Sequence, residues 1–194
     1  MQLTVLKEAG YKEAMLGLSL SYGQTWKPVD ELKAYEVASR LSHKGDGHNK
    51  FLESMVVWLD ITAPRFFWAE FDTYRVGVTK QSASTMHTLK RDGVQDNQFD
   101  PHPGHLAIAK LKDAVTGNMG IEMIKAMLPE SFLQRRIVCL NYAVLQRMYR
   151  QRRKHRLPQW RKFCEALADG LKFPYFVVGK SEEAKHSESG GIDE

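Results

Sequence analysis

Two polar side chains in the second half of the chain, Asn141 and Arg152, have the types and spacing to contact one extended ligand. Apolar residues recur around them at helical spacing, which predicts one long helix over residues 130–153. Eleven steps of about 100° return to nearly the same side of a helix, about 16 Å further along it. Arginine suits forked recognition of phosphates and of uracil-type carbonyls. From the spacing alone, the simpler interpretation is a locally bonded Asn141 and an exposed Arg152.

A histidine pair in a polar segment is the second group that could do chemistry. His102 and His105 lie in residues 91–105, a predicted loop that also carries Asp96 and Asp100. Histidine and carboxylate side chains ligate divalent metals, but no further ligand is evident in the sequence. We therefore predict no metal site. The sequence also lacks a glycine-rich phosphate loop, an HExxH motif and a GxSxG elbow.

The elements that position these residues begin with a short strand near residues 2–6, followed by a weakly defined segment. A turn at residues 27–28 precedes a predicted helix over residues 31–41, with Asp30 as its N-cap. Two glycines mark residues 42–50 as a loop.

Residues 54–62 alternate in hydrophobicity, which predicts a strand with one buried face. That face is expected to consist of Met55, Val57, Leu59 and Ile61. The next helix is predicted to begin at Pro64, whose missing N–H costs nothing at a first helical position, and to end at Gly77. Its core stripe is expected to be Phe67, Phe71 and Tyr74.

The second half of the chain reads as mostly helical. We predict helices over residues 106–115, 121–128, 130–153 and 158–171, with a short closing segment over 173–178. The stripe of the longest helix is Leu133, Ile137, Leu140, Val144 and Met148. Helices interleaved with few strands indicate an α+β fold.

Composition indicates an ordinary globular protein. The chain has 194 residues, of which 43% are hydrophobic and 26% charged, enough for a single domain over residues 1–179. Residues 180–194 are poor in apolar side chains, and we expect a disordered tail. The first residues do not have the basic and apolar segments of a secretory signal, and no apolar run is long enough for a bilayer. We therefore expect a cytoplasmic protein with no membrane association, in which Cys139 and Cys164 are buried, reduced thiols on helices.

The net charge of +5 comes largely from one segment, residues 147–162. Its basic side chains are Arg147, Arg150, Arg152, Arg153, Lys154, His155, Arg156, Arg161 and Lys162. Such a basic cluster suits anionic partners, either nucleotide phosphates or nucleic acid, although a solvated helix face is the simpler explanation for a charge run. Tyr149 and Trp160 would then offer rings on which bases can stack.

Several short motifs occur in a fixed order along the chain. They are His48, Phe51-Leu52-Glu53, Ala63-Pro64, Leu128-Pro129, Asn141, Arg152, His155 and Gln159-Trp160. In this order and spacing, over about residues 45–175, the chain resembles the flavin-dependent thymidylate synthases.

The resemblance implies an α+β fold in which a small, mostly antiparallel sheet packs with long helices. It implies the conversion of dUMP to dTMP, with FAD as cofactor and with methylenetetrahydrofolate and NADPH as co-substrates. In such enzymes the protein supplies binding and orientation, and the flavin supplies the chemistry. Because family sites are built between subunits, the resemblance also implies a homotetramer.

Roles for individual residues also follow from the resemblance. It implies that Arg152 holds and polarises the pyrimidine and is the catalytic residue. It implies that Gln81, with Ser82 or Ser84, binds the nucleotide phosphate; a one-residue shift leaves both serines as candidates. The side chains implied to contact the flavin are His48, Arg75 and Asn141.

The chain departs from the family pattern at its most diagnostic triplet. The family's Arg-His-Arg falls on Thr73-Tyr74-Arg75, so only the last arginine is kept, and Glu70 and Asp72 are acidic neighbours. The family's Arg-Tyr pair becomes Thr85-Met86 or Met86-His87. Each lost charge-assisted hydrogen bond is worth about 1.5–3 kcal/mol. Two alternatives therefore stay open: a catalytically silent or repurposed nucleotide-binding relative, and a nucleic-acid-binding protein that uses the basic cluster.

Overall fold

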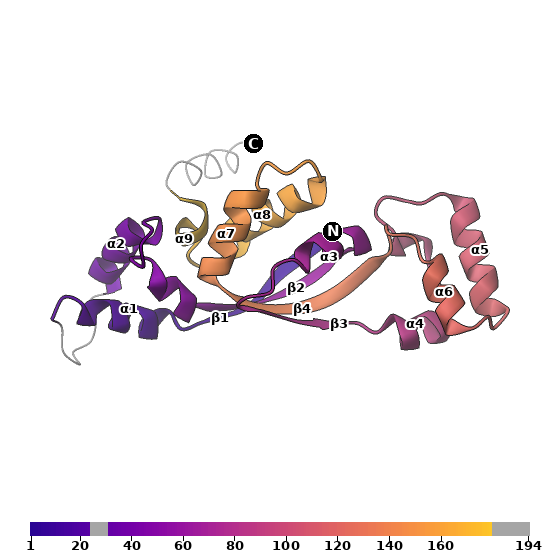
Figure 1. Ribbon diagram of the computed structural model, residues 1–194, viewed down its shortest axis with the longest axis horizontal. Helices are drawn as coiled ribbons and strands as arrows, with labels where there is room; N and C mark the ends of the chain where they lie inside the picture. Colours follow the sequence, from indigo (N-terminus) through magenta and orange to yellow (C-terminus); the bar gives the residue numbers. More distant parts are fainter. Residues whose placement is uncertain (24–30, 180–194) are drawn as a thin grey trace, which may run out of the picture. The chain divides into compact units, whose positions relative to one another are not determined.

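The computed structural model describes residues 1–23 and 31–179, and over them the chain has an α+β fold (Figure 1). Within these residues a four-stranded antiparallel sheet has the strand order β1-β2-β4-β3. The strands are β1 (Gln2–Ala9), β2 (Val56–Pro64), β3 (Val78–Ser82) and β4 (Leu133–Asn141). The Tyr142 N–H, just after β4, donates to the Met55 carbonyl, just before β2, at 2.9 Å, as antiparallel neighbours require. The prediction of an α+β fold with a small antiparallel sheet is confirmed.

The remaining elements are helices. They are α1 (Tyr11–Leu20), α2 (Glu31–Ser42), α3 (Arg65–Phe71), α4 (Thr85–Asp92), α5 (His105–Thr116), α6 (Ile121–Met127), α7 (Tyr142–Arg152), α8 (Pro158–Gly170) and α9 (Tyr175–Val178), with 3-10 turns η1 (Lys50–Ser54) and η2 (Asp96–Gln98). Among the described residues, none of these helices is long and apolar enough to cross a membrane. The predicted turn at residues 27–28, the Asp30 cap and the tail over 180–194 lie outside the described residues.

The chain divides into two compact units. The first unit comprises residues 1–3, 60–75 and 80–137, and the second comprises residues 4–59, 76–79 and those from 138 onward. Each strand therefore contributes residues to both units.

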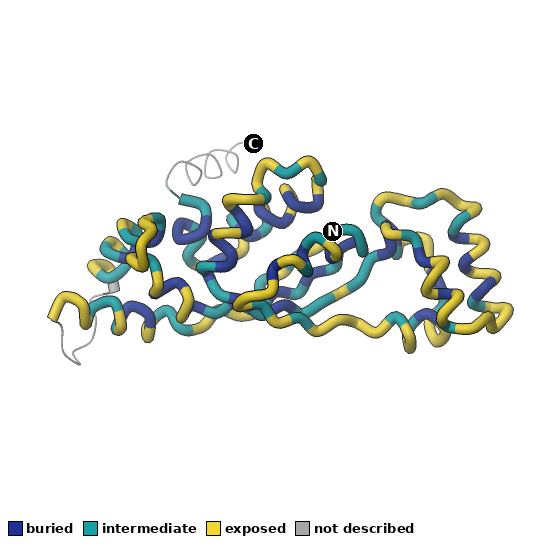
Figure 2. Tube along the Cα trace, viewed as in Figure 1, coloured by how far each residue is buried: buried dark blue, intermediate teal, exposed yellow. Residues whose placement is uncertain are grey.

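In the first unit, α4, α5 and α6 pack together around an apolar cluster (Figure 1). Its members are Leu89, Val94, Phe99, Ile108, Leu111, Ala114, Ile124, Leu128 and Phe132. The buried residues of α5 are Ile108, Leu111 and Ala114, which recur every three positions and so form one buried side of the helix (Figure 2). Helices α5 and α6 confirm the predictions for residues 106–115 and 121–128.

Helix α3, also in the first unit, is shorter than predicted. Phe67, Phe71 and Tyr74 are buried, as the stripe predicted, but the helix ends at Phe71. The Thr73 hydroxyl donates to the Glu70 carbonyl at 2.7 Å, which satisfies a backbone group at the helix end. Pro64 is the last residue of β2 and the N-cap of α3, so its assignment as the first helical residue is wrong. Gly77 lies beyond the helix, in the turn before β3, and does not end it.

In the second unit, α7 packs against α8, α9 and η1. The buried amide of Gln146 on α7 donates to the carbonyls of Ser42, at 2.8 Å, and Phe176, at 2.7 Å. This single side chain therefore ties the end of α2 to α9. The Tyr142 hydroxyl, at the start of α7, donates to the Glu8 carboxylate and accepts from the Phe173 N–H at 3.3 Å.

The predicted long helix over residues 130–153 is wrong. Residues 133–141 form β4, in which Val138 and Leu140 are buried with the period of two that a strand requires. The helix begins only at Tyr142, because the Asn141 side chain caps it. Cys139 accordingly lies on a strand rather than a helix, and is half-buried.

Other predicted elements are close to those observed. The strand near residues 2–6 extends to Ala9, and helices α2 and α8 match the predictions for residues 31–41 and 158–171. The predicted face Met55, Val57, Leu59 and Ile61 is buried. Helices α1 and α4 and strand β3 were not predicted.

Candidate functional site

Three side chains predicted to bind a nucleotide, Gln81, Ser82 and Ser84, lie on one exposed stretch of the first unit. Gln81 and Ser82 end β3, which is an edge strand, and Ser84 is the N-cap residue of α4. Ala83 between the serines is fixed to β4: its N–H donates to the Arg135 carbonyl at 2.9 Å. Residues two apart in an extended chain face the same way, so both serine hydroxyls can face one ligand.

The altered triplet lies just upstream, between α3 and β3. Arg75 is exposed, whereas Tyr74 is 7% exposed and packs edge-to-face on Phe71 with 6.3 Å between ring centroids. The middle residue of the triplet therefore belongs to the core of the first unit, and Arg75 is its one exposed cation.

Asp72, expected to repel an anionic ligand, is already neutralised within the first unit. Its carboxylate lies 2.8 Å from Lys80 Nζ and 3.0 Å from Arg136 Nη1. Partial burial acts to raise the pKa of Asp72, but hydrogen bonds from Lys80 and Arg136 outweigh it and hold the pKa below its ordinary value. The Arg136 guanidinium also stacks on the Trp68 ring, with 4.4 Å from Cζ to the ring centroid. The two cations are thus engaged by groups of this chain.

Asn141 and Arg152 occupy opposite ends of α7 in the second unit. Asn141 Oδ1 accepts the Val144 N–H at 3.0 Å, which is the local bonding that the simpler interpretation expected. The predicted single helix with both side chains on one side is wrong, because Asn141 precedes the helix and folds onto its N-terminus. Only the amide Nδ2 of Asn141 is left to donate elsewhere.

Arg152 is half-buried at the last residue of α7. Its guanidinium lies over the Trp160 ring, 4.5 Å from Cζ to the centroid, and Nη1 is 3.0 Å from His155 Nε2. Trp160 is fully buried at the start of α8. The guanidinium therefore lies over a buried ring, whereas the spacing alone indicated an exposed side chain and the family resemblance implied a pyrimidine-binding one.

His48 lines a pocket of about 540 Å³ in the second unit. The walls come from α1, the turn around residues 46–48 and η1, and they include Glu53 and Lys50 beside apolar groups such as Leu18 and Phe51. The motif His48 to Glu53 thus surrounds one cavity. Sequence reasoning missed the wall supplied by α1, because that helix was not predicted.

The two aromatic rings of the basic cluster are not exposed for stacking with bases. Trp160 is fully buried and Tyr149 is 6% exposed, so neither presents a face on which a base can stack. Arg161 donates to the carbonyls of His155, at 2.8 Å, and Arg156, at 3.1 Å, which closes the turn between α7 and α8. Any contact of this segment with nucleic acid would therefore depend on its cations alone.

No protein-family model and no curated protein matches the chain. Solved structures do match. Two crystal structures of the flavin-dependent thymidylate synthase ThyX from Helicobacter pylori, both with FAD and dUMP, superpose with a TM-score of 0.80. Each shares 16% sequence identity with this chain and covers 92% of it, and 98% of the enzyme chain is matched. At this identity the comparison establishes that the chain has the fold of that enzyme.

Proposed function

We propose that the chain is a divergent relative of the flavin-dependent thymidylate synthases, which binds FAD and dUMP and converts dUMP to dTMP. The observation that carries the proposal is the match of folds, with a TM-score of 0.80, over 92% of this chain and 98% of an enzyme complexed with FAD and dUMP. The order of His48, Glu53 and Arg152 supports it, because these residues recur where the family motifs stand.

The nucleotide phosphate is assigned to Gln81, Ser82 and Ser84. All three are exposed, and the two serines are two residues apart in an extended segment held to β4, so both hydroxyls can face one ligand. Their amide and hydroxyl groups are donors that a phosphate accepts.

The pyrimidine is assigned to Arg152. Because the guanidinium already lies over the Trp160 ring, the arginine enters binding with little further loss of side-chain freedom. A positioned fork of N–H donors can orient a uracil ring and withdraw electron density from its carbonyl groups. This is the role of the catalytic residue in the proposed reaction.

The flavin is assigned to His48, Arg75 and Asn141. For His48 the assignment is supported by the cavity that it lines, whose volume of about 540 Å³ lies in the range of about 300–1,000 Å³ usual for ligand sites. Arg75 adds an exposed cation, and Asn141 Nδ2 adds a donor. When bound, FAD supplies the hydride of the reaction, with NADPH as reductant and methylenetetrahydrofolate as carbon donor. By the same resemblance we propose a homotetramer, and the cytoplasmic location expected from the sequence stays a proposal.

A second candidate function is that of a nucleotide-binding relative without synthase activity. The observation that favours it is the state of the triplet: Tyr74 is buried, and Lys80 and Arg136 pair with Asp72. Fewer cations are then available to hold an anionic cofactor than in the family pattern.

One assay separates the two functions. Purified protein is incubated with FAD, NADPH, methylenetetrahydrofolate and dUMP, and dTMP is measured by mass spectrometry. The proposal expects dTMP from the natural chain, none from Arg152→Ala, and an unchanged yield from Arg147→Ala, which removes an exposed arginine of the same helix. Binding of FAD and dUMP without dTMP would establish the second candidate, and dTMP formation by Arg152→Ala would remove the role of that arginine.

A further inference from the structure

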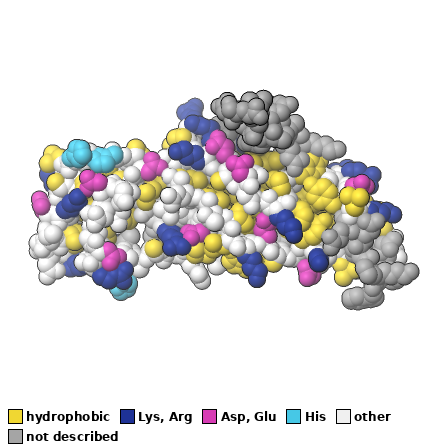
Figure 3. Space-filling model, turned by 180° about the vertical axis from the view of Figure 1, so that it is seen from behind, with side chains coloured by type: hydrophobic (Ala, Val, Ile, Leu, Met, Phe, Trp, Pro, Cys, Tyr) yellow, Lys and Arg dark blue, Asp and Glu magenta, His cyan; other side chains and the backbone are white. Residues whose placement is uncertain are grey.

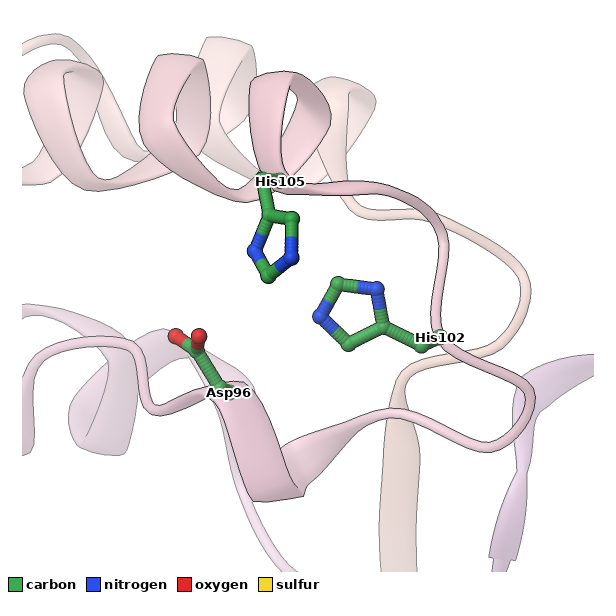
Figure 4. Close-up of side chains that lie close together, drawn as sticks. All are labelled: Asp96, His102 and His105. Atoms are coloured by element: carbon green, nitrogen blue, oxygen red, sulfur yellow. The ribbon is translucent and has the colours of Figure 1, made fainter.

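Three side chains with metal-binding groups, none of them assigned above, lie together in the first unit (Figure 4). Asp96 belongs to η2, His102 to the following loop, and His105 is the first residue of α5. One ligand atom from each lies within 4.8 Å of the others, and all three residues are exposed. Figure 3 shows histidine side chains side by side on the surface that it draws.

We propose that Asp96, His102 and His105 form a binding site for a divalent first-row transition metal, best matched by Zn²⁺. Two imidazoles and one carboxylate are a donor set that Zn²⁺ takes in proteins, with a fourth position left for water. Mg²⁺ and Ca²⁺ prefer oxygen ligands throughout, so two histidines disfavour them.

The backbone restricts where these ligands can go. His102 lies between Pro101 and Pro103, whose rings fix φ on either side of it. Gly104, with φ of +96°, makes the bend that places His105 at the start of α5. The two imidazole rings consequently have centroids 4.9 Å apart.

Asp96 is held from two directions. It lies in a 3-10 turn whose capping box joins Gln95 and Gln98, with Gln95 N–H donating to Gln98 Oε1 at 2.9 Å. Lys112 Nζ, on α5, lies 2.7 Å from Asp96 Oδ1. The lysine therefore competes with a metal for that carboxylate.

Asp100, the second acid of this loop, does not belong to the site. Its carboxylate lies 3.0 Å from the amino group of Met1. The sequence alone could not separate the two acids, because both precede the histidine pair by a few residues.

Binding requires one local rearrangement. The Gly104 N–H donates to His102 Nδ1 at 3.1 Å, which places the proton of a neutral ring on Nε2, the atom that Figure 4 shows directed toward Asp96 and His105. A metal at Nε2 moves that proton to Nδ1 and releases Gly104 N–H, which is exposed and can bond to water. The bound metal would join η2 to the first turn of α5 and so stabilise this loop.

The test is a titration of the full chain with ZnCl₂ by calorimetry and with CoCl₂ by visible absorbance. The proposal expects one site per chain and cobalt bands of a low-coordinate complex. His102→Ala, His105→Ala and Asp96→Asn should each weaken the affinity by about tenfold or more. Lys112→Gln should strengthen it, whereas Lys110→Gln, a matched exposed lysine of the same helix, should leave it unchanged.

Circular dichroism of each variant without metal establishes that it is folded. If folded His102→Ala and His105→Ala bind Zn²⁺ as the natural chain does, the metal binds elsewhere and the site is refuted. The same conclusion follows if the natural chain gives no heat and no cobalt bands, or if Lys112→Gln weakens binding.

Discussion

The guanidinium of Arg152 lies over the Trp160 ring, 4.5 Å from Cζ to the ring centroid. The ring is fully buried while the arginine is half-buried, so a fixed surface orients a side chain that can still reach a ligand. Such a cation–π contact contributes about 0.5–2 kcal/mol. It explains how the last residue of α7 can serve as a recognition group.

Replacing this arginine by lysine should impair nucleotide binding without unfolding the chain. Arg152→Lys keeps the charge but removes the planar fork, and each lost charge-assisted bond is worth about 1.5–3 kcal/mol, which is roughly tenfold to a hundredfold in affinity. The measurement is the dissociation constant for dUMP in the presence of FAD. Arg147→Lys is the control on the same helix, and equal affinity of the Arg152→Lys protein would contradict the assignment.

Gly10, the N-cap residue of α1, and Gly17 within that helix should respond to alanine in opposite directions. A Cβ at Gly10, where φ is +88°, would lie 2.2 Å from the Ser54 carbonyl oxygen, and backbone must move to admit it. A Cβ at Gly17 meets nothing within 4 Å, and alanine there should raise the free energy of unfolding by about 0.5–1 kcal/mol. Urea denaturation should therefore show Gly10→Ala destabilised and Gly17→Ala stabilised, and a stable Gly10→Ala protein would contradict the placement of α1 against η1.

The Asp72 carboxylate should make stability depend on acid pH. Its pKa is lowered in the folded chain, so its contribution is present above the unfolded value of about 3.9 and is lost as pH falls through the folded value. The urea midpoint of the natural chain should fall more between pH 7 and pH 3 than that of Asp72→Asn. The control Asp113→Asn removes an exposed acid of α5, and its urea midpoint should fall between pH 7 and pH 3 as much as that of the natural chain. Identical pH profiles for the natural chain and Asp72→Asn would show that the Lys80–Asp72–Arg136 group contributes nothing.

The buried cysteine should be inert in the folded protein. Burial, with the nearby Glu165, raises the pKa of the Cys164 thiol to about 12, so almost no thiolate exists at pH 8. Iodoacetamide followed by mass spectrometry should label Cys164 only after urea is added, and Cys139, which is half-buried, before it. Rapid labelling of Cys164 without urea would mean that α8 opens readily.

The sequence predicted best those elements whose pattern has one period. Apolar residues recur every two positions at Val57, Leu59 and Ile61, and the predicted strand is observed. They recur at helical spacing at Ile108 and Leu111, and the predicted helix is observed. The segment from Leu133 to Met148 was wrongly predicted as one helix. Leu133, Ile137 and Leu140 fall at helical intervals although they lie on a strand. Asn141 carried the missing signal, since an N-cap residue marks where a helix starts.

The candidate site was less accessible to sequence reasoning, because its electrostatics depend on partners far apart in the chain. From the sequence, Asp72 was expected to repel an anionic ligand, but its carboxylate forms salt bridges with Lys80 and Arg136. The spacing of Arg152 alone indicated an exposed side chain, because its contact with Trp160 depends on the turn between α7 and α8. The wall of the His48 pocket was missed because Gly10 and Gly17 made α1 look unlike a helix.

The most direct test of the central claim, that this chain binds a flavin and a uracil nucleotide together, is a titration with FAD in the absence and presence of dUMP. Visible absorbance reports the flavin environment, and calorimetry gives the affinity. The account predicts that FAD binds and that dUMP changes its spectrum in the natural chain but not in Arg152→Ala. A chain that binds no FAD under either condition would contradict the account and would mean that the fold serves another ligand.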